Sequence, residues 1–298
     1  DAPAGPILPP EVVQAFGQVL QNPQLDAAFN ELALTLPSET YLAEQLTVVD
    51  PLRIHQVRQA MRLQLALELH TQWVQIYESH RTHGTFSIDA QAMGSRALAN
   101  MALLHLCMAS TLASSSDWPD QALHAFKGAT NMTDRMGAVN ALVQTQHPHA
   151  QQALAQFHSL FARDELVIDK WFALQASAPD QDGSVLDQVK RLMRHPDFQL
   201  RNPNRARSLI STYCHANPAA FHRADASGYV FWSERVMEID AINPQVAARL
   251  ARALDRWRNL AQPYQHAAAE ALKRISAKAD LSKDVREVVT RALQEIST

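Results

Sequence analysis

Five Asn-Pro or Asp-Pro dipeptides punctuate the chain, and they constrain its fold more than any other feature of the sequence. An Asn or Asp side chain at a helix start accepts a hydrogen bond from a backbone N–H that has no partner within the helix. Proline suits the next position because it has no N–H to leave unpaired. Each dipeptide therefore predicts the start of a helix, at Asn22-Pro23, Asp50-Pro51, Asn202-Pro203, Asn217-Pro218 and Asn243-Pro244.

Apolar residues recur at helical spacing between these dipeptides. After Asp50 they come every three or four residues, which predicts one helix of about seven turns, through Ile54, Val57, Met61, Leu65, Leu69, Trp73 and Ile76. A second long helix is predicted from Ser87 or Asp89 to the serines at 114–116. The same pattern predicts further helices over 131–143, 149–165, 169–177, 183–194, 204–215, 228–240, 243–258, 264–276 and 281–296. The pair Val48-Val49 is too short for a strand.

The composition also favours helices. The 298 residues include only 8 glycines, whereas hairpins depend on glycine in their tight turns. Apolar residues make up 47% of the chain, enough for a folded core. Helices joined by short loops, with no position recurring at a fixed period, predict an all-α fold of the irregular HEAT/armadillo-like helical-repeat solenoid type. We expect a single all-helical domain over 11–298, preceded by a proline-rich linker at 1–10.

Charge and cysteine content exclude several classes of protein. A net charge of −3, from 27 basic and 30 acidic residues, does not favour a polyanion, so we expect no nucleic-acid partner. Cys107 and Cys214 are two distant thiols, which fit neither a disulfide framework nor a zinc site. No apolar stretch approaches the roughly 20 residues of a membrane span, and the first ten residues do not resemble a signal peptide. We therefore expect a protein of a reducing compartment, without a membrane partner.

No catalytic motif stands out. A zinc peptidase of the common type needs His-Glu-x-x-His on one helix face, and the chain contains no His-Glu dipeptide. The pairs His80/His83 and His147/His149 lack a third ligand at a suitable spacing, so we interpret them as surface residues. Phosphate-binding glycine loops and Gly-x-Ser-x-Gly are absent as well. We expect no catalytic residue, metal ligand or cofactor in this chain, which indicates a binding, structural or regulatory role.

Two aromatic residues and an acidic pair have structural interpretations. Trp171 and Phe172 are expected to pack in the core. The acidic residues of Asp164-Glu165 and Asp169-Lys170 do not suggest a catalytic carboxylate pair, because an Asp that opens a helix is usually a cap or part of a surface ion pair. The basic run at 252–260 resembles a calmodulin target, although a solvent-exposed helix face is the simpler interpretation.

Seven segments, taken in order, resemble the C-terminal region of bacterial aminopeptidase N. Each segment alone is moderately specific, and the assignment rests on their shared order and similar spacing over nearly the whole chain. They are ALTLPSE (33–39), VVDPLRIHQVRQAM (48–61), TNMTDRMGAVNAL (130–142), VIDKWFALQA (167–176), NPNRARSLI (202–210), NPAAFHRADASGY (217–229) and NPQVAARL (243–250).

The resemblance implies that this chain is the last, all-helical domain of a cytoplasmic zinc aminopeptidase that removes N-terminal amino acids from peptides. In that family the domain packs against the catalytic and N-terminal domains of the same polypeptide. It closes a cavity around the active site and restricts the entry of peptide substrates. The zinc-binding His-Glu-x-x-His and the Gly-Ala-Met-Glu-Asn motif belong to the catalytic domain, and neither occurs here. The parent protein would be a metallopeptidase, whereas this chain alone would not be an enzyme.

The resemblance also implies three residues of the substrate-cavity wall. The positions matching Arg207 and Arg249 point into the cavity in the family, and Gln245 matches a residue near the entrance to the site. Two cations beside helix N-termini would suit a peptide carboxylate. The alternative is that both arginines pair with nearby acids such as Asp225 and Glu238.

Arg205 and Arg207 both follow the predicted helix start at Asn202, where a cation is disfavoured by roughly 0.3–1 kcal/mol. The two side chains lie about 200° apart around a helix, so we expect Arg205 to face away from Arg207 and to lie at the surface.

A free-standing helical-repeat scaffold that binds a protein partner is the alternative function. The length of the native polypeptide upstream of Asp1 distinguishes the two hypotheses. If the chain is a domain cut from an enzyme, we also expect an exposed apolar docking face and self-association of the isolated chain.

Overall fold

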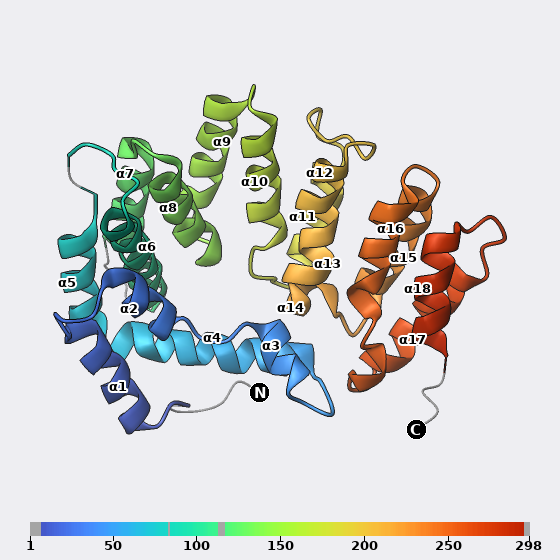
Figure 1. The fold of residues 1–298 in the computed structure, drawn as a ribbon, viewed down its shortest axis with the longest axis horizontal. Helices are drawn as coiled ribbons and strands as arrows, with labels where there is room; N and C mark the ends of the chain where they lie inside the picture. Colours follow the sequence, from blue (N-terminus) through green and yellow to red (C-terminus); the bar gives the residue numbers. More distant parts are fainter. Residues whose placement is uncertain (1–6, 83, 113–116, 295–298) are drawn as a thin grey trace. The chain divides into compact units, whose positions relative to one another are not determined.

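The computed structural model describes residues 7–82, 84–112 and 117–294, which fold into helices (Figure 1). These residues form two compact units. The first unit contains the chain up to Pro37 together with Gln56–Leu160, and the second contains Ser38–His55 and the chain from Phe161 onward. A short early segment therefore belongs to the same unit as the C-terminal half.

Helix α6 forms the centre of the first unit. It packs against α2, α5, α7 and α8, and its residues Leu98, Ala102 and Leu106 are completely buried. Trp73 of α5 is also fully buried and donates its indole N–H to the Leu65 carbonyl at 3.0 Å, so the ring is buried without an unpaired donor. The helices of this unit are α1 (Pro10–Gln21), α2 (Ala27–Leu34), most of α4 (Pro51–Glu68), α5 (His70–His80), α6 (Ala90–Ser110), α7 (Trp118–Gly128), α8 (Met132–Gln144) and α9 (His149–Phe161).

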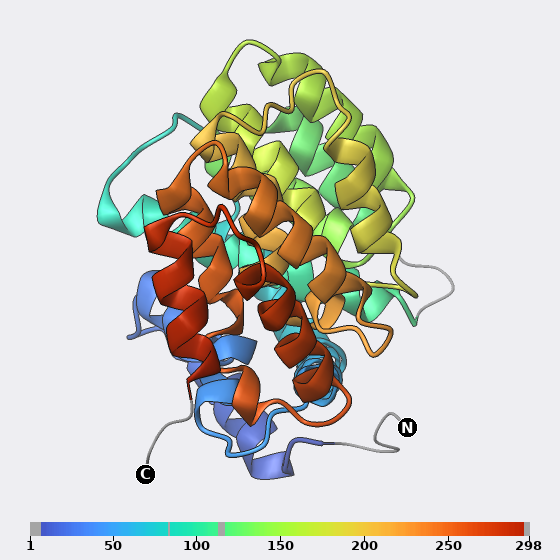
Figure 2. The same cartoon turned by 90° about the vertical axis from the view of Figure 1, so that its right-hand side faces the viewer.

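The second unit contains more and shorter helices. Its C-terminal helices α15 to α18 pack side by side, as the orange and red ribbons of Figure 2 show. Buried Trp232 of α15 donates its indole N–H to the Leu250 carbonyl of α16 at 2.9 Å. The elements are α3 (Glu39–Glu44), the start of α4, α10 (Glu165–Ala176), α11 (Ser184–Leu192), α12 (Pro203–Ala206), the π-helix η1 (Arg207–Ser211), α13 (Thr212–Ala216), α14 (Pro218–Phe221), α15 (Ser227–Asp240), α16 (Pro244–Ala251), the 3₁₀ turns η2 (Arg252–Leu254) and η3 (Trp257–Asn259), α17 (Tyr264–Ser276) and α18 (Lys283–Leu293).

The predicted all-α fold class is confirmed. Within the described ranges the β-structure amounts to one isolated parallel bridge between Val49 and Leu260. Trp171 and Phe172 are buried, as expected, and Asp164 caps α10 by accepting the Val167 N–H. In the described part of the chain, no helix is both long and apolar enough to cross a membrane.

Four of the five Asx-Pro dipeptides begin a helix, and the prediction at Asn22-Pro23 is wrong. Helix α1 ends at Gln21, and the Asn22 side chain accepts the Gln24 N–H at 3.0 Å in a local turn. Asp26 caps α2 instead, accepting the Phe29 N–H at 2.8 Å. An Asn or Asp side chain accepts a backbone N–H both as a helix cap and in a local turn. The dipeptide alone therefore does not distinguish a helix start from a turn that follows a helix.

Two predicted helices are shorter in the structure. The long helix after Asp50 divides at Leu69, which separates α4 from α5. The helix predicted over 243–258 ends at Ala251 and continues as 3₁₀ turns. Arg258 of the basic run donates to the Leu293 carbonyl at 2.9 Å, so this run completes the end of α18 rather than forming an exposed helix face. Most of the predicted linker lies outside the described residues, and the single domain over 11–298 stays a prediction.

Candidate functional site

Two of the three predicted cavity residues lie together in the second unit. Gln245 and Arg249 are one turn apart on α16, and both line an open groove that also includes Arg252. Helix α18 contributes Asp284 and Glu287 to the same groove. All five side chains are exposed. The groove therefore presents two cations, two carboxylates and one amide to solvent, and sequence reasoning missed Arg252 and both acids.

Arg207 is exposed and is not part of this groove. It begins the π-helical turn η1, where its guanidinium folds back over the preceding turn. Its Nε donates to the Pro203 carbonyl at 3.1 Å, and its Nη2 donates to the Asn204 amide oxygen at 2.8 Å. These contacts are local, so they hold the charge at the surface close to the helix start.

The alternative pairing of the two arginines with Asp225 and Glu238 is wrong. Asp225 pairs with Arg223 at 3.0 Å, and Glu238 pairs with an arginine of its own helix at 3.2 Å. Among the residues that the structure describes, Arg207 and Arg249 have no carboxylate within ion-pair distance.

Arg205 is buried, which contradicts the expected surface position. Its side chain is 6% exposed, its Nη1 lies 2.9 Å from the Asp169 carboxylate, and its guanidinium lies 5.1 Å from the centre of the Phe172 ring. The ion pair is close in distance, although Nη1 lacks the alignment of a hydrogen bond. Asp169 and Phe172 are three residues apart on α10, so they share one helix face. The partly buried carboxylate of Asp169 on this face explains an arginine at a helix start, where the helix dipole disfavours a cation.

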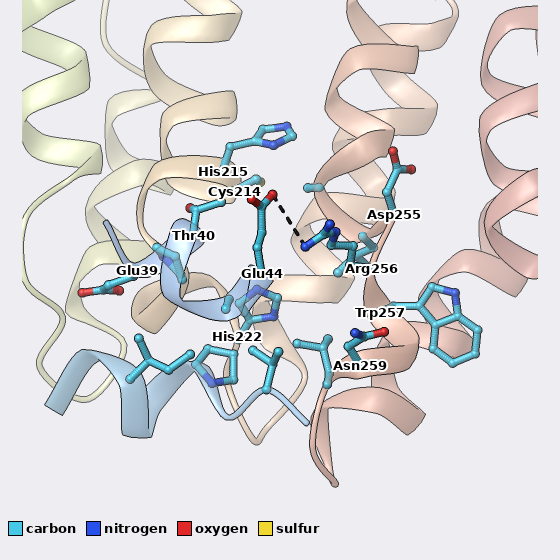
Figure 3. A pocket seen from close by; sticks show the side chains of 18 of the residues that line it. Glu39, Thr40, Glu44, Cys214, His215, His222, Asp255, Arg256, Trp257 and Asn259 are labelled. Carbon is cyan, nitrogen blue, oxygen red and sulfur yellow. Dashed lines mark ion pairs between the residues drawn. The ribbon is translucent and has the colours of Figure 1, made fainter. Parts of the chain in front are cut away.

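The second unit also contains a pocket of about 320 Å³, drawn in Figure 3. It is lined by residues of α3, the start of α4, α13, α14 and the chain from η2 to Leu260. Val49, Ile54, Leu254 and Leu260 form much of its apolar lining. Arg252 lines both this pocket and the α16–α18 groove, so the two features adjoin.

One ion pair joins opposite sides of the pocket. Arg256 Nη1 lies 3.6 Å from Glu44 Oε1, and Figure 3 shows the two side chains meeting between α3 and the turn after η2. Burial lowers the pKa of His222, whose Nδ1 lies 2.8 Å from the Tyr229 hydroxyl. Burial also raises the pKa of the Cys214 thiol. At neutral pH the imidazole and the thiol are uncharged, so carboxylates and guanidinium groups determine the field in the pocket.

The sequence contained no motif for this pocket because its residues come from 39–54 and 214–260. The histidine pairs singled out in the sequence lie elsewhere. His149 pairs with Asp120 at 2.7 Å, its ring lies beside that of His147, and both are half-buried. His80 lies 3.3 Å from the Ser95 hydroxyl, and His83 lies outside the described residues.

Comparisons with known proteins agree with this architecture. Residues 4–294 match a family model described as a domain of unknown function, DUF3458_C, with ARM repeats. Aminopeptidase N of Caulobacter vibrioides is 36% identical over 281 residues, which cover 94% of this chain and 32% of that protein. Aminopeptidase N of Escherichia coli is 35% identical over 286 residues, covering 96% of this chain and 32% of that protein.

A solved structure gives the same result in three dimensions. The crystal structure of Legionella pneumophila aminopeptidase A, in complex with aspartic acid, aligns with a TM-score of 0.85 and 26% identity. The alignment covers 96% of this chain and 34% of that one. The chain thus spans about a third of the length of the relatives it matches, and the resemblance to the C-terminal region of bacterial aminopeptidase N is confirmed. It belongs to the DUF3458_C family of ARM-repeat domains.

Proposed function

We propose that this chain is the C-terminal domain of a cytoplasmic zinc aminopeptidase, in which it closes the cavity around the active site and restricts the access of peptides. The supporting observation is the match of nearly the whole chain to about a third of bacterial aminopeptidase N. Zinc and the catalytic groups would come from the rest of the polypeptide, because this sequence contains no His-Glu-x-x-His. The partners of the domain would then be the catalytic and N-terminal domains and the peptide substrates.

Arg249 and Arg207 would hold the carboxylate or backbone carbonyls of short peptides in the closed enzyme, with Gln245 near the entrance. The exposure of both arginines and the lack of a described ion-pair partner support this role. Arg207 follows closely on the helix start at Asn202, whereas Arg249 lies in the last turn of α16, because that helix ends at Ala251. Asp284 and Glu287 oppose an anionic guest in the groove of Arg249. The strength of the contact therefore depends on how far the closed enzyme excludes water, because Coulomb interactions strengthen as the local dielectric falls.

Alanine substitutions in the full-length enzyme test this role. A desolvated arginine–carboxylate contact contributes about 1.5–3 kcal/mol. Arg207→Ala and Arg249→Ala should each lower kcat/KM for di- and tripeptides by roughly 10- to 150-fold. Aminoacyl-anilides have no carboxylate and should be affected much less. Arg201→Ala is the control, because Arg201 is exposed just before α12. Equal effects in all three variants, or an equal loss for both substrate classes, would show that the arginines do not bind the peptide carboxylate.

The isolated chain provides a second test. It should bind no stoichiometric zinc and release no amino acid from aminoacyl-anilides, because the zinc motif is absent. It should also self-associate in sedimentation experiments, since the first unit exposes Phe29, Leu32, Ile88 and Met93. Chelator-resistant hydrolysis that copurifies with the chain would contradict the proposal. A native polypeptide that begins near Asp1 would favour the scaffold alternative.

A further inference from the structure

The pocket of Figure 3 places the carboxylate of Glu44 and the guanidinium group of Arg256 together, beside an apolar lining. We propose that it binds a free α-amino acid with an apolar side chain. The ammonium group contacts Glu44, the carboxylate contacts Arg256, and the side chain lies against the apolar residues. The inference does not rest on the proposed role in a peptidase, because the pocket is lined by neither Arg207 nor Gln245 nor Arg249.

The Glu44–Arg256 ion pair is weak enough to open for a guest. Its closest atoms are 3.6 Å apart, and the Arg256 and Glu44 side chains are 65% and 46% exposed. Exposed ion pairs contribute little to stability, because water solvates both charges and the long side chains lose entropy when they are held together. A guest that supplies an ammonium group and a carboxylate replaces the contact on both sides and leaves neither charge unpaired.

An α-amino acid matches the spacing of this pair. Its ammonium and carboxylate groups are attached to one carbon atom, so they can contact two side chains that already lie close together. Arg256 can engage a carboxylate through two parallel N–H···O bonds, and Glu44 accepts from the ammonium group. These charge-assisted contacts select for both the ammonium group and the carboxylate group of the guest.

The other ionisable groups of the pocket leave its net charge near zero. Glu39 is held by His55 at 2.7 Å, and Figure 3 shows its carboxylate turned away from Glu44. Asp255 and Arg252 add one charge of each sign. A guest with no net charge fits this field better than a simple anion or cation does.

The apolar lining selects the side chain of the guest. Val49, Ile54, Leu254 and Leu260 line this space. A volume of about 320 Å³ is at the small end of ligand pockets, which suits a single amino acid. Leucine and phenylalanine bury apolar surface here, whereas aspartate brings a second carboxylate to groups that cannot solvate it.

Calorimetric titration of the 298-residue chain with L-leucine tests the proposal, with far-UV circular dichroism confirming that each variant is folded. Saturable 1:1 binding is expected, and leucinamide and 4-methylpentanoate, which lack the carboxylate and the amine respectively, should bind at least tenfold more weakly. Glu44→Gln and Arg256→Gln should each weaken leucine binding by about tenfold or more. The fluorescence of Trp257, which also lines the pocket, should report the same saturation.

Arg274→Gln is the matched control, because Arg274 and Glu234 form an exposed ion pair at the same distance of 3.6 Å outside the pocket. This variant should bind leucine as the unmodified chain does. The proposal is wrong if the folded chain does not bind leucine saturably, or if binding survives both pocket substitutions. Equal affinity for leucinamide or 4-methylpentanoate would also overturn it. In the full-length polypeptide, where leucine can reach other domains, loss of one binding event in the pocket variants identifies the site.

Discussion

Replacing Arg205 should destabilise the second unit far more than replacing Arg207, although the two residues are almost adjacent in sequence. Arg205→Met keeps much of the side-chain volume near Phe172 but removes the charge that faces Asp169. The carboxylate of Asp169 is only 16% exposed, so it would be left largely buried without a counter-ion. Arg207→Met removes a charge that is already in solvent.

The expected loss follows from the burial of the pair. Breaking a buried ion pair by removing one partner costs about 3–5 kcal/mol. Asp169 retains some solvent and lies 3.4 Å from the Ser208 hydroxyl, so we expect the lower end, about 3 kcal/mol. For a unit of this size each kcal/mol lowers Tm by about 2–4 °C, which gives a decrease of roughly 6–12 °C. Arg207→Met should change the free energy of unfolding by less than about 0.5 kcal/mol.

Urea and thermal unfolding followed by circular dichroism measure these differences. The double variant Arg205→Met/Asp169→Leu should recover much of the loss, because an apolar pair of similar volume can replace a buried ion pair. If Arg205→Met and Arg207→Met lose the same stability, burial of the pair is not what distinguishes them. A double variant that loses as much stability as Arg205→Met and Asp169→Leu lose separately, added together, would contradict this explanation.

Two further predictions concern a close backbone contact and a buried imidazole. Gly228→Ala should lower the free energy of unfolding by more than about 2 kcal/mol, because its Cβ would overlap the Phe221 carbonyl. Gly128→Ala is the control, since its Cβ would meet open space, and it should leave the urea midpoint unchanged or raised. Burial lowers the pKa of His105 to about 4, so the unfolded chain takes up this proton near its ordinary pKa of 6.5 while the folded chain does not. The free energy of unfolding should therefore decrease as the pH falls from about 6.5 to 4, by up to about 3 kcal/mol. His105→Phe should flatten this dependence of stability on pH. An unchanged pH dependence in that variant would show that His105 does not cause it.

Local signals in the sequence were enough to predict the helical class and many helix starts. Asn202 and Asn243 cap their helices as predicted, with side chains that accept N–H groups two or three residues ahead. Asp50 does the same for Arg53 at 3.1 Å. Helix starts can be predicted from the sequence because a cap and its partner lie within one turn of each other. The spacing of apolar residues likewise reflects the local geometry of the helix. The resemblance to aminopeptidase N was also found from the sequence, through seven segments that occur in the same order.

Local sequence signals did not predict which charged residues are buried and which line a site, because both depend on the packing of distant segments. Arg205 is buried because Asp169, 36 positions earlier in the sequence, lies opposite it, whereas Arg207 has local partners and stays in solvent. Asn217 looks like a cap, yet its amide donates to the Ala176 carbonyl at 3.0 Å, across 41 residues. The pocket likewise joins Glu44 to Arg256 from distant parts of the chain. Local patterns specify a side chain's position on its helix. Burial and charge pairing depend on which distant segments pack against that helix, and only the folded chain brings those segments together.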